Sequence, residues 1–67
     1  MDSKRIGRRI KAFRKLKGYT QIHFAKELNV SISQIGNVER GTKPVTDELM
    51  NQIADVLDIP KEEITME

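Results

Sequence analysis

The sequence predicts an all-α fold, a compact bundle of five short helices with a tight turn between two central ones. Three observations predict it. Apolar residues recur at helical spacing along the whole chain of 67 residues. Residues that can cap a helix, and glycines that can end one, stand at the edges of these periodic segments. Neither sustained alternation nor a hairpin dipeptide marks a strand.

The first helix is predicted over residues 3–17. Ser3 is expected to cap its start, because a hydroxyl can accept a hydrogen bond from a free backbone N–H of the first turn. Gly18 is expected to stop it, after lysines in the last turn that suit the negative end of the helix dipole. The side chains predicted to face inward are Ile6, Ile10, Phe13 and Leu16.

The second and third helices are predicted close together in the middle of the chain. Thr20 is expected to cap a helix over residues 21–28, and Asn29 can take the left-handed conformation at its end. Ser31 is then expected to cap a helix over residues 32–40, which a glycine ends. The predicted inward side chains of these two helices are Phe24, Ala25, Leu28, Ile35 and Val38.

Two further helices are predicted after a loop. Thr46 is expected to begin a helix over residues 46–57, with two acidic residues in the first turn, where the dipole favours anions. Pro60 suits the first position of a short helix over residues 60–65. The predicted apolar residues here are Leu49, Met50, Ile53, Ala54, Val56, Leu57, Ile59 and Ile64. A chain of this length has room for one domain, residues 1–67.

The charge is distributed very unevenly along the chain. Residues 1–43 hold eleven of the twelve Lys and Arg against three acidic residues, a balance of +8. Residues 44–67 hold one lysine against seven acidic residues, a balance of −6. The basic segment attracts phosphates at long range, and the acidic segment is expected to point away from DNA.

The composition argues against several classes of protein. Cysteine is absent, so neither a disulfide nor a thiolate metal site is expected, which fits a cytoplasmic protein. The single histidine, His23, is expected on the surface rather than on a metal. No apolar run approaches the ~20 residues that cross a bilayer, and a secretory signal is lacking at the N-terminus. Nothing resembles a nucleophile with its base, so neither an enzyme nor a cofactor is expected.

The third predicted helix has an outward side of small and neutral residues. If Ile35 and Val38 face inward, steps of about 100° per residue define that side. The predicted base-contacting residues are Ile32, Ser33, Gly36 and Asn37. Asn37 can bond an adenine edge with both ends of its amide, and Ile32 can meet a thymine methyl. Two short helices joined this way place the second in the DNA major groove, which predicts a sequence-specific DNA-binding regulator.

Other residues are expected to contact the DNA backbone or to hold the fold together. Gln21 opens the second helix, where its amide and the free backbone N–H groups can hold a phosphate. Just beyond the third helix lie the candidate backbone contacts Arg40, Thr42 and Lys43. Arg14 and Glu39 each lie beside a core position, and a bidentate ion pair between them is predicted to tie the first helix to the third.

Nearly the whole chain resembles the Xre-type helix-turn-helix family, the group of Cro and the lambdoid phage repressors. The matching motifs are IGRRIKAFRKLKGYTQ, FAKELNV, IGNVERGTKP and IADVLDI. The resemblance implies a lambda repressor-like DNA-binding domain whose third helix reads the major groove in bacteria or phages. It also implies base contacts for Ile32, Ser33 and Asn37, backbone proximity for Gln34, and a phosphate or base contact for Gln21. Arg14 and Glu39 match the family's inter-helix ion pair.

Two functions from different classes remain open on the sequence. The first is a transcriptional regulator, a repressor acting as a homodimer on double-stranded operator DNA at the nucleoid. The second is a protein-interaction module, such as an antitoxin or an adaptor that sequesters another regulator. The acidic C-terminal third and the outward positions of Ile22 and Ile32 motivate this second reading.

Overall fold

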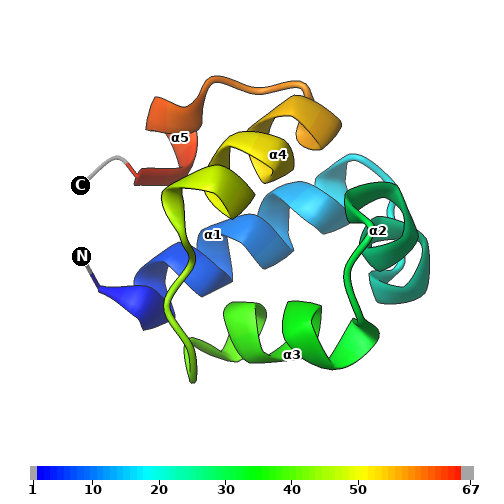
Figure 1. Cartoon of the computed structure of the whole chain (residues 1–67). Coiled ribbons are helices and arrows are strands. Elements are labelled where there is room, and N and C mark those ends of the chain that lie inside the picture. The colour runs from blue at the N-terminus through cyan, green and yellow to red at the C-terminus, as the bar shows by residue number, and fades with distance from the viewer. Residues whose placement is uncertain (1, 66–67) are drawn as a thin grey trace.

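The computed structural model describes residues 2–65, and those residues form five helices (Figure 1). They are α1 (Ser3–Leu16), α2 (Gln21–Leu28), α3 (Ile32–Arg40), α4 (Asp47–Leu57) and α5 (Lys61–Thr65). The predicted all-α class and helix order are confirmed, while three of the predicted ends differ from the observed ones by one residue. Residue 1 and residues 66–67, the ends of the predicted domain, lie outside the described part of the chain.

Local chemistry sets the start of the first four helices. Thr20, Ser31 and Thr46 each accept a hydrogen bond from a backbone N–H three residues on, at 3.0, 3.0 and 3.1 Å respectively, as predicted. The prediction that Ser3 caps α1 is wrong. Asp2 caps it instead, because its carboxylate accepts from two backbone N–H groups of the first turn, at 3.0 and 3.3 Å, and its charge suits the positive end of the helix.

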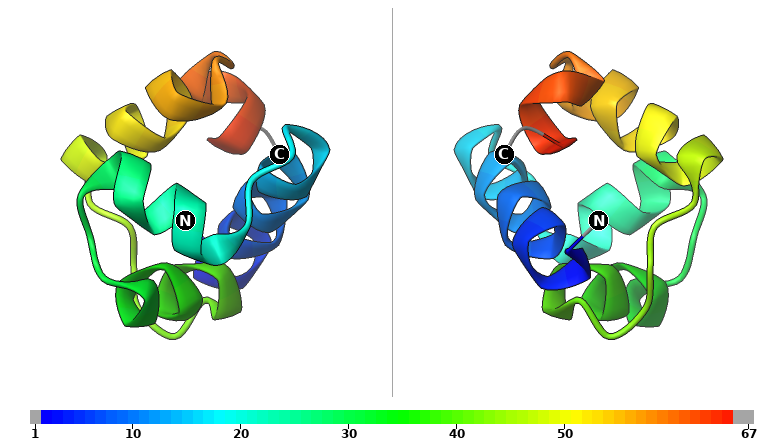
Figure 2. Two further views of the ribbon diagram at one scale, coloured as in Figure 1. Left: turned by 90° about the vertical axis from the view of Figure 1, so that its right-hand side faces the viewer. Right: turned by 90° about the vertical axis from the view of Figure 1, so that its left-hand side faces the viewer.

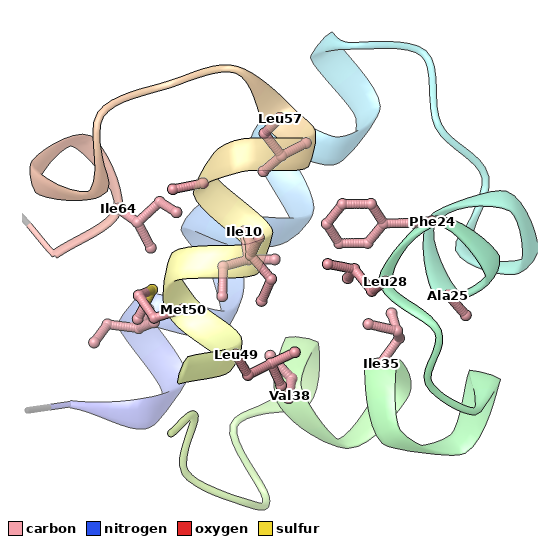
Figure 3. Packing of buried hydrophobic residues seen from close by; sticks show 13 residues of the cluster. Ile10, Phe24, Ala25, Leu28, Ile35, Val38, Leu49, Met50, Leu57 and Ile64 are labelled. Carbon is pink, nitrogen blue, oxygen red and sulfur yellow. The ribbon is translucent and has the colours of Figure 1, made fainter. Parts of the chain in front are cut away.

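Side chains from all five helices meet in one apolar cluster (Figure 3). Phe24, the largest of its side chains, is fully buried, together with Ile10 and Ile35. The remaining buried members are Ile6, Ala25, Leu28, Val38, Leu49, Met50, Ile53, Ala54, Leu57 and Ile64. The expectation that Leu16 faces inward is wrong: it is 74% exposed, because α1 ends at this residue, on the outer surface. None of the helices in the described range is long and apolar enough to cross a membrane.

Helix α1 crosses α3 at very short range, and glycine makes this possible. A Cβ atom built on Gly7 would collide with the carbonyl oxygen of Val38 and lie only 2.7 Å from that of Glu39. Gly41 ends α3 with φ of +73°, and a Cβ built on it would lie only 2.6 Å from Cα of Lys4. The two helices therefore touch through their backbones, which fixes the position of α3 against the rest of the molecule.

Helices α3 and α5 lie at opposite edges of the molecule, and both views show this separation (Figures 1 and 2). Helix α1 and helix α4 lie between them, and α5 contacts both of these helices. Glu62 and Glu63, two exposed acidic residues of α5, are thus remote from α3. The acidic residues of α5 therefore lie away from α3, as expected, whereas the exposed Asp47 and Glu48 lie in the first turn of α4.

Candidate nucleic-acid interface

Helices α2 and α3 form a unit joined by a tight turn. Asn29 ends α2 in the left-handed conformation, with φ of 59° and ψ of 43°. The next N–H, from Val30, donates to the carbonyl of Ala25 at 3.0 Å, and Ser31 then caps α3. Such a pair of helices is the unit that presents its second helix to the DNA major groove.

One side of α3 is buried, and the other side is open to solvent. Ile35, Val38 and Glu39 are buried against the neighbouring helices. Ser33 and Arg40 are exposed, and Asn37, which lies between them on the same side, is half-buried. The predicted outward side of α3 is therefore present, and it extends from Ser33 in the first turn through Asn37 to Arg40 at the end of the helix.

Two predicted base-contacting residues lie at the margins of this outward side. Ile32 is 47% exposed at the start of α3. Gly36 is buried, so the expectation that it lies open to a nucleobase is wrong. The cause is Arg40, whose guanidinium lies across the helix, with Nη1 3.0 Å from where a Cβ of Gly36 would be. The open surface at this turn of α3 belongs to Arg40 rather than to Gly36.

The side chain of Asn37 contacts two residues that were predicted to bind the DNA backbone rather than the bases. The Arg40 Nη2 group donates to Asn37 Oδ1 at 2.9 Å, and the Thr42 hydroxyl lies 3.1 Å from the same oxygen. The Thr42 hydroxyl also lies 3.2 Å from the carbonyl oxygen of Asn37. Arg40 and Thr42 were predicted as backbone contacts, yet both touch the predicted base-reading amide. The spacing of Asn37 and Arg40, three residues apart on one helix, was the available signal.

The predicted ion pair ties α1 to α3. Arg14 Nε donates to Glu39 Oε2 at 2.6 Å and Nη2 donates to Oε1 at 3.2 Å, with both side chains buried. Arg14 Nη1 also donates to the carbonyl of Tyr19 at 2.7 Å, so this guanidinium is bound on three sides. A bidentate pair of this kind fixes both distance and orientation.

Gln21 belongs to the same network. Its amide nitrogen donates to Glu39 Oε1 at 3.0 Å, and the side chain is part-buried. An N–H group that was expected to hold a phosphate is therefore engaged inside the protein. Gln21 therefore links α2 to α3, and its contact with a DNA phosphate stays a prediction, for which the amide has a second N–H.

Four predicted contact residues surround a shallow hollow beside α3. Its volume is about 350 Å³, and it is bordered by α3, by the loop after α3 and by the start of α4. The predicted contact residues on its wall are Ser33, Gln34, Asn37 and Lys43. The hollow lies along the outward side of α3, where a duplex held against that helix would pass.

The comparisons with known proteins agree with this geometry. Residues 10–64 match the family described as helix-turn-helix. The chain is 48% identical, over 64 residues, to the uncharacterized HTH-type transcriptional regulator YazB of Bacillus subtilis (strain 168), covering 96% of this chain and 93% of that protein.

Two solved structures share the fold over almost all of the chain. The restriction-modification controller protein C.AhdI from Aeromonas hydrophila is 32% identical, with a TM-score of 0.89 over 94% of this chain and 96% of the other. The clp gene regulator ClgR from C. glutamicum is 26% identical, with a TM-score of 0.92 over 98% of this chain and 86% of the other. The chain therefore belongs to the Xre-type helix-turn-helix family, the Cro and lambdoid phage repressor-like group of DNA-binding transcriptional regulators.

Proposed function

We propose that this chain represses transcription by binding operator DNA as a homodimer, with α3 of each copy in the major groove. The observation that carries the proposal is the outward side of α3, on which Ser33, Asn37 and Arg40 follow one another with polar groups facing solvent. These side chain types supply the donors and acceptors that distinguish base edges in the major groove.

The attachment of α3 supports a reading role. Its backbone touches α1 at Gly7, and the buried pair of Arg14 and Glu39 joins the same two helices through their side chains. A recognition surface on a rigid element keeps its groups in register with successive base pairs. The outward side chains of α3 are thus presented on a helix that cannot rotate without losing buried contacts.

The charge distribution supports the orientation on DNA. Lys43 lies beside the hollow next to α3, and the Lys- and Arg-rich N-terminal segment includes α1, α2 and α3. The acidic residues of α5 lie at the opposite edge of the molecule. A duplex carries one negative charge per ~1.7 Å of axis, so the molecule is expected to dock with α3 toward the duplex and α5 away from it.

A dimer is proposed because one module offers little contact surface. A single small DNA-binding module buries roughly 600–1,000 Å² of protein surface, whereas tight specific complexes bury more. Two copies related by a two-fold axis would place their α3 helices on half-sites about 34 Å apart. Occupation of such a site excludes other proteins from it by binding alone, so the proposed outcome is repression at the nucleoid in the cytoplasm, without a catalytic step.

A second candidate function is supported by one observation. Ile22 and Ile32 are 57% and 47% exposed, at the starts of α2 and α3. Apolar side chains at these positions suit a protein partner, as in an antitoxin or an adaptor that sequesters another regulator.

Two experiments separate the two functions. Selection of bound sequences from a random duplex pool is expected to yield a two-fold symmetric motif, and titration of random duplex at two salt concentrations is expected to show a steep loss of affinity with salt. Absence of binding even at low salt would favour the protein-interaction module instead.

A further inference from the structure

We infer that Asn37, Arg40 and Thr42 act as one unit in which the free polar groups of Asn37 and Arg40 are hydrogen-bond donors only, and that this unit selects guanine in the major groove. The inference rests on the proposed function, since it specifies the base that the outward side of α3 prefers. It differs from the adenine contact expected for a free asparagine, and the difference follows from atoms that lie within 3.2 Å of Asn37.

The orientation of the Asn37 amide follows from the chemistry of its neighbour. An arginine guanidinium carries N–H donors and no acceptor, so the amide atom 2.9 Å from Arg40 Nη2 must be the oxygen. The amide nitrogen consequently faces the other way. Within residues 2–65, this nitrogen has no hydrogen-bond partner, so its N–H groups are available to a ligand.

The amide oxygen already has hydrogen-bond donors beside it. A carbonyl oxygen has two lone pairs, and Oδ1 of Asn37 faces the Arg40 guanidinium at 2.9 Å and the Thr42 hydroxyl at 3.1 Å, whose single proton also faces the Asn37 carbonyl oxygen at 3.2 Å. An adenine would need one of these lone pairs, because asparagine reads adenine by donating to N7 and accepting from N6. In the conformation observed here, adenine N6 would have to compete at that acceptor with the Arg40 guanidinium and the Thr42 hydroxyl.

Gly36 and the end of α3 hold Arg40 in this position. The absence of a side chain at Gly36 lets the guanidinium lie across the helix, only 3.0 Å from where a Cβ would stand. Arg40 also lies in the last turn of α3, where a cation is favoured by the helix dipole. The position of the arginine is thus set by the shape and field of the helix as well as by Asn37.

Guanine is the base whose major-groove edge suits such a unit. It presents two acceptors, N7 and O6, whereas adenine presents one acceptor and one donor, and cytosine presents a donor. The free N–H groups of Asn37 and the remaining N–H groups of Arg40 supply donors only. A guanine therefore meets complementary groups at both of its acceptors, and adenine N6 meets a donor.

The test measures the ratio of guanine to adenine at the base pair that Asn37 contacts. Sequences bound by the unaltered full chain are selected from a random duplex pool, and the position is the one whose preference disappears in Asn37→Ala. We expect guanine there, and we expect replacement of that guanine by 7-deazaguanine, which lacks the N7 acceptor, to weaken binding by at least about fivefold.

Two variants test the role of the neighbours. Thr42→Val removes one donor to Asn37 Oδ1 with little change in shape, and Arg40→Ala in the same chain removes the other. We expect adenine to become accepted at this position in the double variant, with the guanine-to-adenine ratio falling by roughly fivefold or more. Lys43→Ala is the matched control, since loss of a cation that contacts the DNA backbone should lower affinity without changing the guanine-to-adenine ratio.

The outcomes separate this inference from the proposed function. Adenine selected by the unaltered chain, or a ratio unchanged in the double variant, would overturn the donor unit while leaving base reading by α3 intact. A motif that Asn37→Ala does not alter would instead overturn base reading at this position, and the donor unit with it. Since all four substituted side chains are exposed or half-buried, circular dichroism of each variant confirms that the fold is kept.

Discussion

Arg14 and Glu39 form a buried bidentate ion pair, 2.6 Å between Nε and Oε2, that joins α1 to α3. The same carboxylate accepts a hydrogen bond from Gln21 of α2. One side chain thus connects three helices beneath the surface proposed to read DNA, and its charge is compensated inside the core.

Removal of one partner of this pair is expected to be strongly destabilising. Glu39→Leu leaves the Arg14 guanidinium buried without its carboxylate and should lower the free energy of unfolding by about 3–5 kcal/mol. The combined variant Arg14→Met with Glu39→Leu leaves no unpaired charge and should recover much of that loss. Urea unfolding followed by circular dichroism measures both. Equal losses in the single and the double variant would contradict this account.

Gly7 lies at the close crossing of α1 and α3 and Gly36 does not, so substitution of these two glycines should have opposite effects on stability. Gly7→Ala forces a methyl group against the carbonyl oxygens of Val38 and Glu39, which are backbone atoms, and should cost at least about 1–3 kcal/mol. Gly36→Ala meets only the mobile end of Arg40 and gains helix propensity of up to about 1 kcal/mol. Thermal melts of the two variants provide the measurement. A Gly7→Ala protein as stable as the unaltered chain would rule out so close a crossing.

The cap of α1 gives a second matched pair. Asp2→Ala removes the carboxylate that accepts from two backbone N–H groups, and should lower the free energy of unfolding by about 0.5–2 kcal/mol. Ser3→Ala removes a hydroxyl that lies inside the helix, so its effect should be within about 0.5 kcal/mol. Chemical unfolding resolves the difference. The reverse ranking would restore Ser3 as the cap.

Two single substitutions on the proposed DNA surface should behave differently. Lys43→Ala should weaken binding to all sequences alike and reduce the slope of log affinity against log salt by about 1. Asn37→Ala should relax base choice by about 1–3 kcal/mol at one position and leave the salt slope nearly unchanged. Fluorescence anisotropy with a selected site and a scrambled site, at several salt concentrations, measures both quantities. If Asn37→Ala lowered affinity for the selected and the scrambled site equally, Asn37 would contact the DNA backbone rather than a base.

The helix starts were predictable because capping is local chemistry. Thr20, Ser31 and Thr46 each stand directly before an apolar periodic segment, and all three cap their helices. The wrong cap was predicted for α1 because Asp2 and Ser3 are adjacent and both residue types cap helices well, so the sequence does not distinguish them. The core followed from the helical period, except at Leu16, where the helix end rather than the period decided exposure.

The details of the proposed site were less predictable, for a physical reason. Helical period places Gly36 near the outward side of α3, but a long arginine side chain from the next turn covers it. The path of that side chain depends on rotamers and on the amide of Asn37, which the period does not encode. The ion pair of Arg14 and Glu39 was predictable, since two charged residues stood beside core positions of opposite helices.

The network around Asn37 has a consequence for how operator preference can diverge among related proteins. Arg40 and Thr42 both contact the Oδ1 atom of Asn37, so a substitution at one of the three residues changes the hydrogen-bonding groups that the other two can offer to a base. Their effects on base choice should therefore be non-additive. Retargeting of this domain by directed evolution would need a library that varies these three positions jointly, whereas Ser33, one turn earlier, can be diversified by itself.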